Sequence, residues 1–165
     1  MIGRIQRPVD FERVLARPSR ARSAHFALHH LPSNPAPSAW AAARLRTAQA
    51  ELSTGEPQAA HSAVEQLPGG EPGAPSGCWL GMVVPKRHAR RAVTRTLLKR
   101  QIRAAFAAAA GLPPGLWVVR LRSPFDRQQF PSAASDALRQ AAHAELAQLF
   151  GRALTPRPAR PGAPA

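Results

Sequence analysis

Apolar and polar positions follow two different periods along this chain. Apolar side chains recur three and four positions apart in segments that we predict to be helices with one buried face: residues 8–16, about 90–110 and about 132–150. Shorter apolar runs predict strands: residues 24–31, 78–84 and 117–121. This order predicts an α+β fold, a small α/β sandwich whose N- and C-terminal helices pack on a central, mostly antiparallel sheet. The helix between the last two strands would form a βαβ crossover.

The long segment between the first two predicted strands has a different composition. Residues 32–77 contain seven prolines, five glycines and four of the nine acids, with only Arg44 and Arg46 as cations. Such a segment can bury little apolar surface, so we expect a disordered insertion with at most a frayed helix over residues 39–52. A binding role for this segment through Trp40 is the alternative.

These boundaries predict one folded domain with two unstructured additions. The domain comprises residues 1–31 and 78–150. Residues 151–165, GRALTPRPARPGAPA, form a Pro-rich basic tail that we expect to be disordered, because it has no apolar pattern with which to pack. The chain has 18 Pro and 11 Gly among 165 residues, more than one compact fold of this size needs.

The segment from Pro85 to Phe106 carries the strongest charge signal. It holds eight of the 23 Lys and Arg residues and no acid: Lys86, Arg87, Arg90, Arg91, Arg95, Lys99, Arg100 and Arg103. Four of these cations recur every four residues, which places them in one ridge along the predicted helix. The opposite side is predicted to dock on the core through Val93, Leu97, Leu98, Ala104 and Ala105.

A row of like charges without an acid destabilises an isolated helix, so a polyanionic partner best explains it. Arg outnumbers Lys six to two in this segment, and the planar fork of Arg donors suits phosphate oxygens. The net charge of +14 and the pI near 12.0 agree with such a partner. We therefore predict nucleic-acid binding. A solvated helix face, or one that lies on a membrane surface, is the alternative.

The basic segment resembles a signature of the bacterial ribonuclease P protein subunit. In that family a strand leads to two basic residues and to a helix that reads Arg-Asn-Arg, then Lys-Arg, then Arg. The matching positions here are Lys86-Arg87, Ala92-Val93, Arg95, Lys99-Arg100 and Arg103. The departures are Thr96 for the usual Asn, Leu97 for the second Arg and Ala104 for a common Glu. The resemblance covers residues 4–31 and 78–150, about two thirds of the chain.

This resemblance implies a left-handed crossover, although such connections are nearly always right-handed. It implies that the eight cations and Thr96 contact the catalytic RNA. It also implies that Phe11, Leu15 and His29 line a cleft for the 5′ leader of precursor tRNA, where a His can stack on a base and donate to phosphate. Core roles for Phe11 and Leu15, and an ordinary surface role for His29, are the alternatives.

The sequence contains no recognisable catalytic or metal site. Outside the insertion only five acids remain: Asp10, Glu12, Asp126, Asp136 and Glu145. No two of them flank a His in a metal-ligand spacing, and no Gly-rich phosphate loop or nucleophile motif occurs. The resemblance implies that the catalytic RNA subunit performs the chemistry and binds most of the Mg²⁺.

The single Cys78 excludes an internal disulfide and a Cys-based zinc site, and it fits a reducing cytoplasm. The N-terminal residues lack the apolar segment of a signal peptide, and no apolar run is long enough for a membrane span. We therefore expect a cytoplasmic protein without a membrane partner. We expect no protein oligomer.

One function follows as an expectation: the protein subunit of ribonuclease P. It would bind the catalytic RNA and the leader of precursor tRNA, while the holoenzyme, an endoribonuclease, hydrolyses the leader to give mature 5′ ends. One alternative is a general RNA-binding or ribosome-associated basic protein. A second is a basic protein without a defined RNA target, acting as a chaperone or an antimicrobial.

Overall fold

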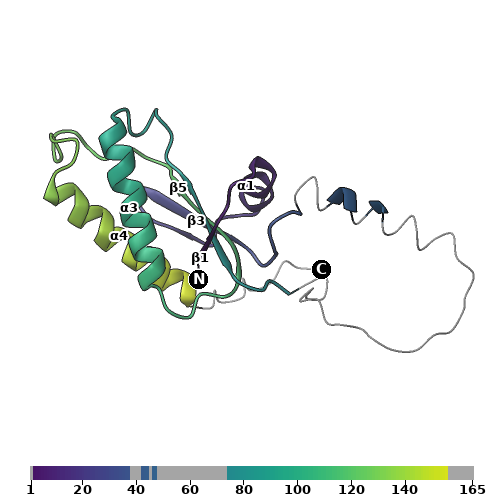
Figure 1. Ribbon diagram of the computed structural model, residues 1–165. Helices are drawn as coiled ribbons and strands as arrows, with labels where there is room; N and C mark the ends of the chain where they lie inside the picture. The colour runs from purple at the N-terminus through teal and green to yellow at the C-terminus, as the bar shows by residue number, and fades with distance from the viewer. Residues whose placement is uncertain (1, 38–41, 45, 48–73, 156–165) are drawn as a thin grey trace, which may run out of the picture.

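The computed structural model describes residues 2–37, 42–44, 46–47 and 74–155. A five-stranded sheet separates two layers, with α3 and α4 on one face and α1 on the other (Figure 1). The elements are β1 (Ile2–Arg4), α1 (Pro8–Leu15), β2 (Ala21–Arg22), β3 (Phe26–Leu31), β4 (Cys78–Val83), α3 (Ala92–Ala108), β5 (Gly115–Leu121) and α4 (Asp136–Leu154). The predicted α+β sandwich is confirmed. Within the described ranges, no helix is both long and apolar enough to cross a membrane.

The sheet is mixed, not mostly antiparallel as expected. Its strand order is β1-β4-β5-β3-β2, in which β4 pairs in parallel with both β1 and β5, whereas β3 pairs antiparallel with both β5 and β2. The difference arises at the N-terminus, where residues for which no strand was predicted form β1 along the outer edge of β4. Parallel β4 and β5 need a crossover connection, and α3 provides it. The hand of this crossover stays a prediction.

The two long helices bury the larger core against one face of the sheet. Leu98, Ile102 and Phe106 of α3 are buried there with Trp117 of β5 and Phe150 of α4. The Phe106 ring meets the other two rings edge-on, at centroid distances of 6.3 Å and 5.7 Å. α3 is thereby fixed on the sheet by one apolar face, which leaves its outer face for other contacts.

Two residues predicted for that apolar face do not belong to it. Val93 is 57% exposed, and Ala104 is exposed as well. At about 100° per residue they lie roughly 140° and 120° from Leu98 around the helix, so neither can reach the core. Ile102 lies only about 40° from Leu98 and is fully buried.

A smaller core lies on the face covered by α1. Val14 of α1, Leu31 of β3 and Val118 of β5 are buried in it, and Phe11 packs at its margin. The Phe11 ring lies directly over Gly81, where an added Cβ would come within 2.5 Å of the ring. Gly81 therefore lets α1 approach the sheet closely.

The C-terminal helix is longer than predicted. α4 begins after Ser135, whose hydroxyl oxygen accepts the Leu138 N–H at 3.1 Å as an N-cap, and it continues to Leu154. Ala153 is 1% exposed and belongs to the larger core. The domain boundary at residue 150 is therefore wrong, because packing of Ala153 carries the helix past Gly151. The remainder of the predicted tail, 156–165, lies outside the described residues.

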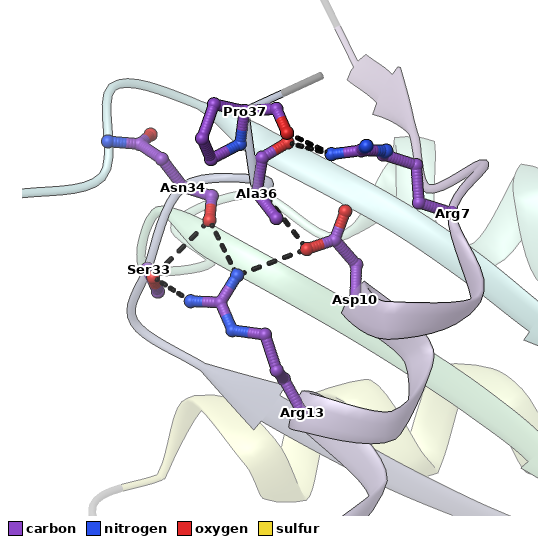
Figure 2. A network of polar contacts seen from close by, with 7 residues as sticks. All are labelled: Arg7, Asp10, Arg13, Ser33, Asn34, Ala36 and Pro37. Atoms are coloured by element: carbon purple, nitrogen blue, oxygen red, sulfur yellow. Dashed lines mark hydrogen bonds and ion pairs between the residues drawn. The ribbon is translucent and has the colours of Figure 1, made fainter. Parts of the chain in front are cut away.

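Side chains of α1 and of the residue before it hold the start of the insertion (Figure 2). The buried Asp10 carboxylate accepts the Ala36 N–H at 2.8 Å and Arg13 Nη1 at 3.0 Å. Arg13 also donates to Ser33 Oγ at 2.7 Å, and Arg7 donates to the Ala36 carbonyl at 2.8 Å. Residues 33–36 are therefore held against the domain by defined contacts, whereas the sequence predicted disorder from residue 32 onward.

Asn34 joins the two ends of the insertion at its base. The Asn34 side chain accepts the Ser76 N–H at 3.0 Å and donates to the Ala74 carbonyl at 3.2 Å. Residues 42–44 and 46–47 are helical, within the frayed helix that was expected. The rest of the predictions for this segment, Trp40 included, falls outside the described residues.

Candidate nucleic-acid interface

A tight turn between β4 and α3 directs the first basic residues outward. The Pro85 carbonyl accepts the N–H groups of His88 and Ala89, both at 3.1 Å, which reverses the chain after β4. Ala89 is buried in the larger core. Because this small side chain points inward, its neighbours Arg87 and Arg90 point into solvent, where both are exposed.

The cations predicted from the sequence share one surface, the outer side of α3 and the turn before it. Six of them are exposed and two are partly buried: Lys86, Arg87, Arg90, Arg91, Arg100 and Arg103, with Arg95 and Lys99. Thr96 is exposed among them. We call these eight cations the α3 basic surface. The structure brings all of them together because the opposite side of the helix is committed to the core.

Arg95 differs from the other cations in what it contacts. Its Nη1 atom donates to the main-chain carbonyls of Ala89 at 3.0 Å and Arg90 at 2.8 Å. This side chain therefore ties the first turns of α3 to the preceding turn and helps to position its neighbours. The four-residue spacing of the cations did not predict this role.

The positive charge of the α3 basic surface is not balanced by acidic side chains of the described residues. α3 has no acid in its first turn and no side-chain cap on its N-cap residue, Arg91. None of the ion pairs among the described residues involves any of the eight cations. The positive end of the helix dipole adds to these charges. Such a surface attracts polyanions.

His29 lies on the face of the sheet that α1 covers, which we call the α1 face. It is not the exposed aromatic that was expected there. It is only 9% exposed, and its Nδ1 lies 3.0 Å from the Arg17 carbonyl at the end of α1. Burial lowers the pKa of His29 below its ordinary value of 6.5, and the charges of Arg120 and Arg22 act in the same direction. The hydrogen bond to the Arg17 carbonyl opposes this shift without overcoming it. His29 is therefore a buried residue held by the Arg17 carbonyl, and its ring is not presented at the surface for stacking on a base.

Phe11 and Leu15 lie where the sequence predicted, on the side of α1 that faces the sheet. Both are partly buried against the smaller core. Arg120, missed as a site residue, belongs to the same face, since Val118 two positions earlier points into that core. Arg120 pairs with Val83 across β4 and is partly buried. The alternation of strand residues could have identified this cation.

Comparison with known proteins decides the family. The family model for ribonuclease P matches residues 3–145. The chain belongs to the ribonuclease P family.

Several curated relatives in this family are similar to the chain over about half its length. The ribonuclease P protein component of Ralstonia pickettii (strain 12J) is 44% identical over 85 residues, which cover 51% of this chain and 59% of that protein. Its counterpart in Burkholderia mallei (strain SAVP1) is 41% identical over 85 residues, or 49% and 62% of the two chains. That of Bordetella parapertussis is 44% identical over 79 residues, or 47% and 60%. The chain thus spans about three fifths of the length of the curated relatives it matches.

Two of the three departures of this chain from the ribonuclease P signature, Leu97 and Thr96, lie in different surroundings. Leu97, which replaces the second Arg, is 7% exposed and packs in the larger core. Thr96, which replaces Asn, lies on the outer surface of α3. The first departure therefore exchanges a cation for core packing, whereas the second keeps a polar side chain between Arg95 and Lys99.

The described residues do not fit a metal centre. Within residues 2–37, 42–44, 46–47 and 74–155, no three His, Cys, Asp or Glu side chains cluster so that they could hold an ion. Asp10 is engaged by Arg13 and the Ala36 N–H, and Glu145 by His25, with Nδ1 to Oε2 at 2.7 Å. For this member of the ribonuclease P family we therefore derive no metal-dependent step from the protein's own side chains.

Proposed function

We propose that this chain is a protein component of ribonuclease P and binds the catalytic RNA through the α3 basic surface. The observation that carries the proposal is the gathering of eight cations, without an ion-pair partner among the described residues, on the outer side of α3 and the turn before it, while the inner side of α3 is fixed in the core. Arginine forks and lysine ammonium groups in such an array match the spacing and charge of a phosphate backbone. Contacts of this kind give affinity and orientation with little sequence readout.

The α1 face is the proposed site for the single-stranded 5′ leader of precursor tRNA. Phe11 and Leu15 offer partly exposed apolar surface there, and Arg120 adds one cation on the same face. Aromatic stacking with a nearby positive charge is the usual means of holding a single strand without reading its sequence. His29 is part of the floor in this proposal and makes no stack.

The chemistry of leader hydrolysis is assigned to the RNA subunit in this proposal. Mg²⁺ would be bound mainly by that RNA, and the protein would orient the two RNA molecules. The holoenzyme would act as an endoribonuclease that gives mature tRNA 5′ ends. The cytoplasm is the expected compartment, as the single Cys78 indicates.

Affinity purification of the tagged full-length chain from its native cells tests this function. We expect one abundant RNA that cleaves precursor tRNA at the 5′ end when it is mixed with the protein and Mg²⁺. A variant with Lys99, Arg100 and Arg103 all changed to Ala should lose most of that RNA. Recovery of ribosomal RNA instead would indicate a general RNA-binding or ribosome-associated protein and would overturn the proposal.

A further inference from the structure

A groove that borders the N-terminal end of the α3 basic surface lies where β4 and β5 end, apart from the sheet face covered by α1. One wall is the turn and first helical residues at 87–98, and the other is the loop at 124–133 between β5 and α4. Its volume is 760 Å³, within the range of about 300–1,000 Å³ usual for ligand sites. The carboxyl ends of adjacent parallel strands are also where open α/β sheets generally bind their ligands.

The groove has an apolar floor and a cationic rim. Leu98, Phe130 and Leu138 contribute to the floor. The rim carries four arginines, three from the α3 side and one from the loop: Arg87, Arg90, Arg91 and Arg127. The single carboxylate in the lining is Asp126, whose Oδ1 accepts the Gln128 N–H at 2.9 Å. The charge of the lining therefore strongly favours an anion.

The loop wall is held in shape by the rest of the fold. Phe125 stacks on the ring of His25 at 3.9 Å between centroids, and Phe130 meets Phe125 edge-on at 5.7 Å. The Phe130 N–H donates to the Asp126 carbonyl at 2.9 Å. At the helix side, Thr94 Oγ1 donates to the Ala133 carbonyl at 2.7 Å and joins the two walls. Because these contacts already hold the loop wall in place, a bound ligand would lose little free energy in ordering that wall.

We infer that this groove binds one unpaired nucleotide of the RNA, with its base against Phe130 and its phosphates on the arginine rim. The base of a nucleotide has a flat face that can pack on the apolar floor, and its phosphate carries the negative charge that suits the arginine rim. Unpaired bases of folded RNA bind in this manner to aromatic side chains. The inference rests on the proposed function, since it names a second contact for the same RNA. It adds Arg127 and Phe130, which lie on the loop and outside the α3 basic surface.

Binding of the full-length protein to the catalytic RNA, measured over a series of salt concentrations, tests the groove. Phe130→Leu keeps an apolar side chain in the floor but removes the aromatic face, and it should weaken binding by about 5- to 100-fold with an unchanged salt slope. Arg127→Ala is a second variant at an exposed position, where the fold is not at risk. It should reduce the log–log salt slope by about one. Arg152→Ala, at the far end of α4, is the charge-matched control and should change neither quantity.

Chemical probing of the RNA bases supplies the second readout. The wild-type protein should protect one unpaired base from modification, and Phe130→Leu should restore its reactivity while leaving the remaining protections in place. Unchanged affinity and protection for both groove variants would overturn the inference. In that case the Lys99, Arg100 and Arg103 variant distinguishes the two claims: if it still loses RNA, only the groove assignment fails, and if it binds normally, the proposed function fails as well.

Discussion

Arg95 Nη1 donates to the main-chain carbonyl of Arg90 at 2.8 Å, so one cation of the α3 basic surface fixes the position of another. The same nitrogen donates to the Ala89 carbonyl at 3.0 Å, next to a side chain buried in the core. The turn before α3 thus has a side-chain clamp of its own. The clamp holds the backbone of the turn from which the neighbouring arginines project.

Removal of this clamp should affect stability, unlike removal of its neighbours. Arg95→Ala should lower the free energy of unfolding by about 1–2 kcal/mol, because two main-chain carbonyls lose a charged donor. Arg100→Ala, at an exposed position in the middle of α3 and outside the clamp, should stay within about 0.5 kcal/mol of wild type. Urea denaturation followed by circular dichroism measures both. Equal, small effects would mean that the two bonds contribute nothing to the fold.

The contacts around Asp10 make a prediction about the base of the insertion. Asp10→Ala leaves Arg13 and the Ala36 N–H without their buried acceptor, so the free energy of unfolding should fall by about 1–3 kcal/mol. Glu12→Ala removes a carboxylate from the exposed side of the same helix and should have little effect. Urea unfolding of the two variants compares them, and a loss as large for Glu12→Ala would contradict the role given to Asp10.

The buried state of His29 predicts a dependence of stability on pH. Its folded pKa is lowered, so the unfolded chain binds a proton more readily than the folded one. The stabilisation is therefore fully present above the unfolded pKa of 6.5 and is lost as pH falls below it. His29→Gln, which keeps a donor toward the Arg17 carbonyl, should flatten the decline in unfolding free energy between about pH 7.5 and pH 5. An unchanged decline would show that His29 titrates alike in both states.

The leader assignment depends on Phe11 now that His29 is buried. Phe11→Leu keeps an apolar contact over Gly81 but removes the aromatic face, so binding of precursor tRNA to the assembled holoenzyme should weaken by about 1–3 kcal/mol. Mature tRNA, which lacks the leader, should bind as before, and Glu12→Ala serves as the control on the same helix. Both affinities should be measured at one salt concentration. Equal losses for precursor and mature tRNA would make Phe11 a core residue only.

The sequence alone predicted an element correctly where a long segment repeats the spacing of one kind of secondary structure. The cations and the core residues around Leu98 identified α3 because 17 residues give several turns of consistent spacing. β1 and β2 have three and two residues, too few to show a period, and each is defined only by its pairing, β1 with the distant β4 and β2 with the nearby β3. The burial of His29 likewise depends on where the chain leaves α1 above the sheet. The alternation of residues along a strand predicts which face a side chain is on, but not what covers that face.

Side-chain roles within the site were harder to predict than the site itself. Charge composition located the α3 basic surface, but the clamp formed by Arg95 depends on the shape of the turn that it contacts. Arg127 was missed because it lies in a loop without periodicity, and only tertiary structure brings it to the same groove as Arg91. The end of α4 was missed because residues 151–155 were assigned to the Pro-rich tail, whereas Ala153 is buried in the larger core.

The salt dependence of binding to the catalytic RNA tests the central claim most directly. The variant with Lys99, Arg100 and Arg103 changed to Ala should make the log–log slope less steep by about two to three units, because about three phosphate contacts are lost. A control with Arg4, Arg17 and Arg152 changed to Ala loses the same charge from exposed positions outside α3 and should keep nearly the wild-type slope. If both variants change the slope equally, only net charge matters, and the claim that α3 presents the RNA-binding surface is contradicted.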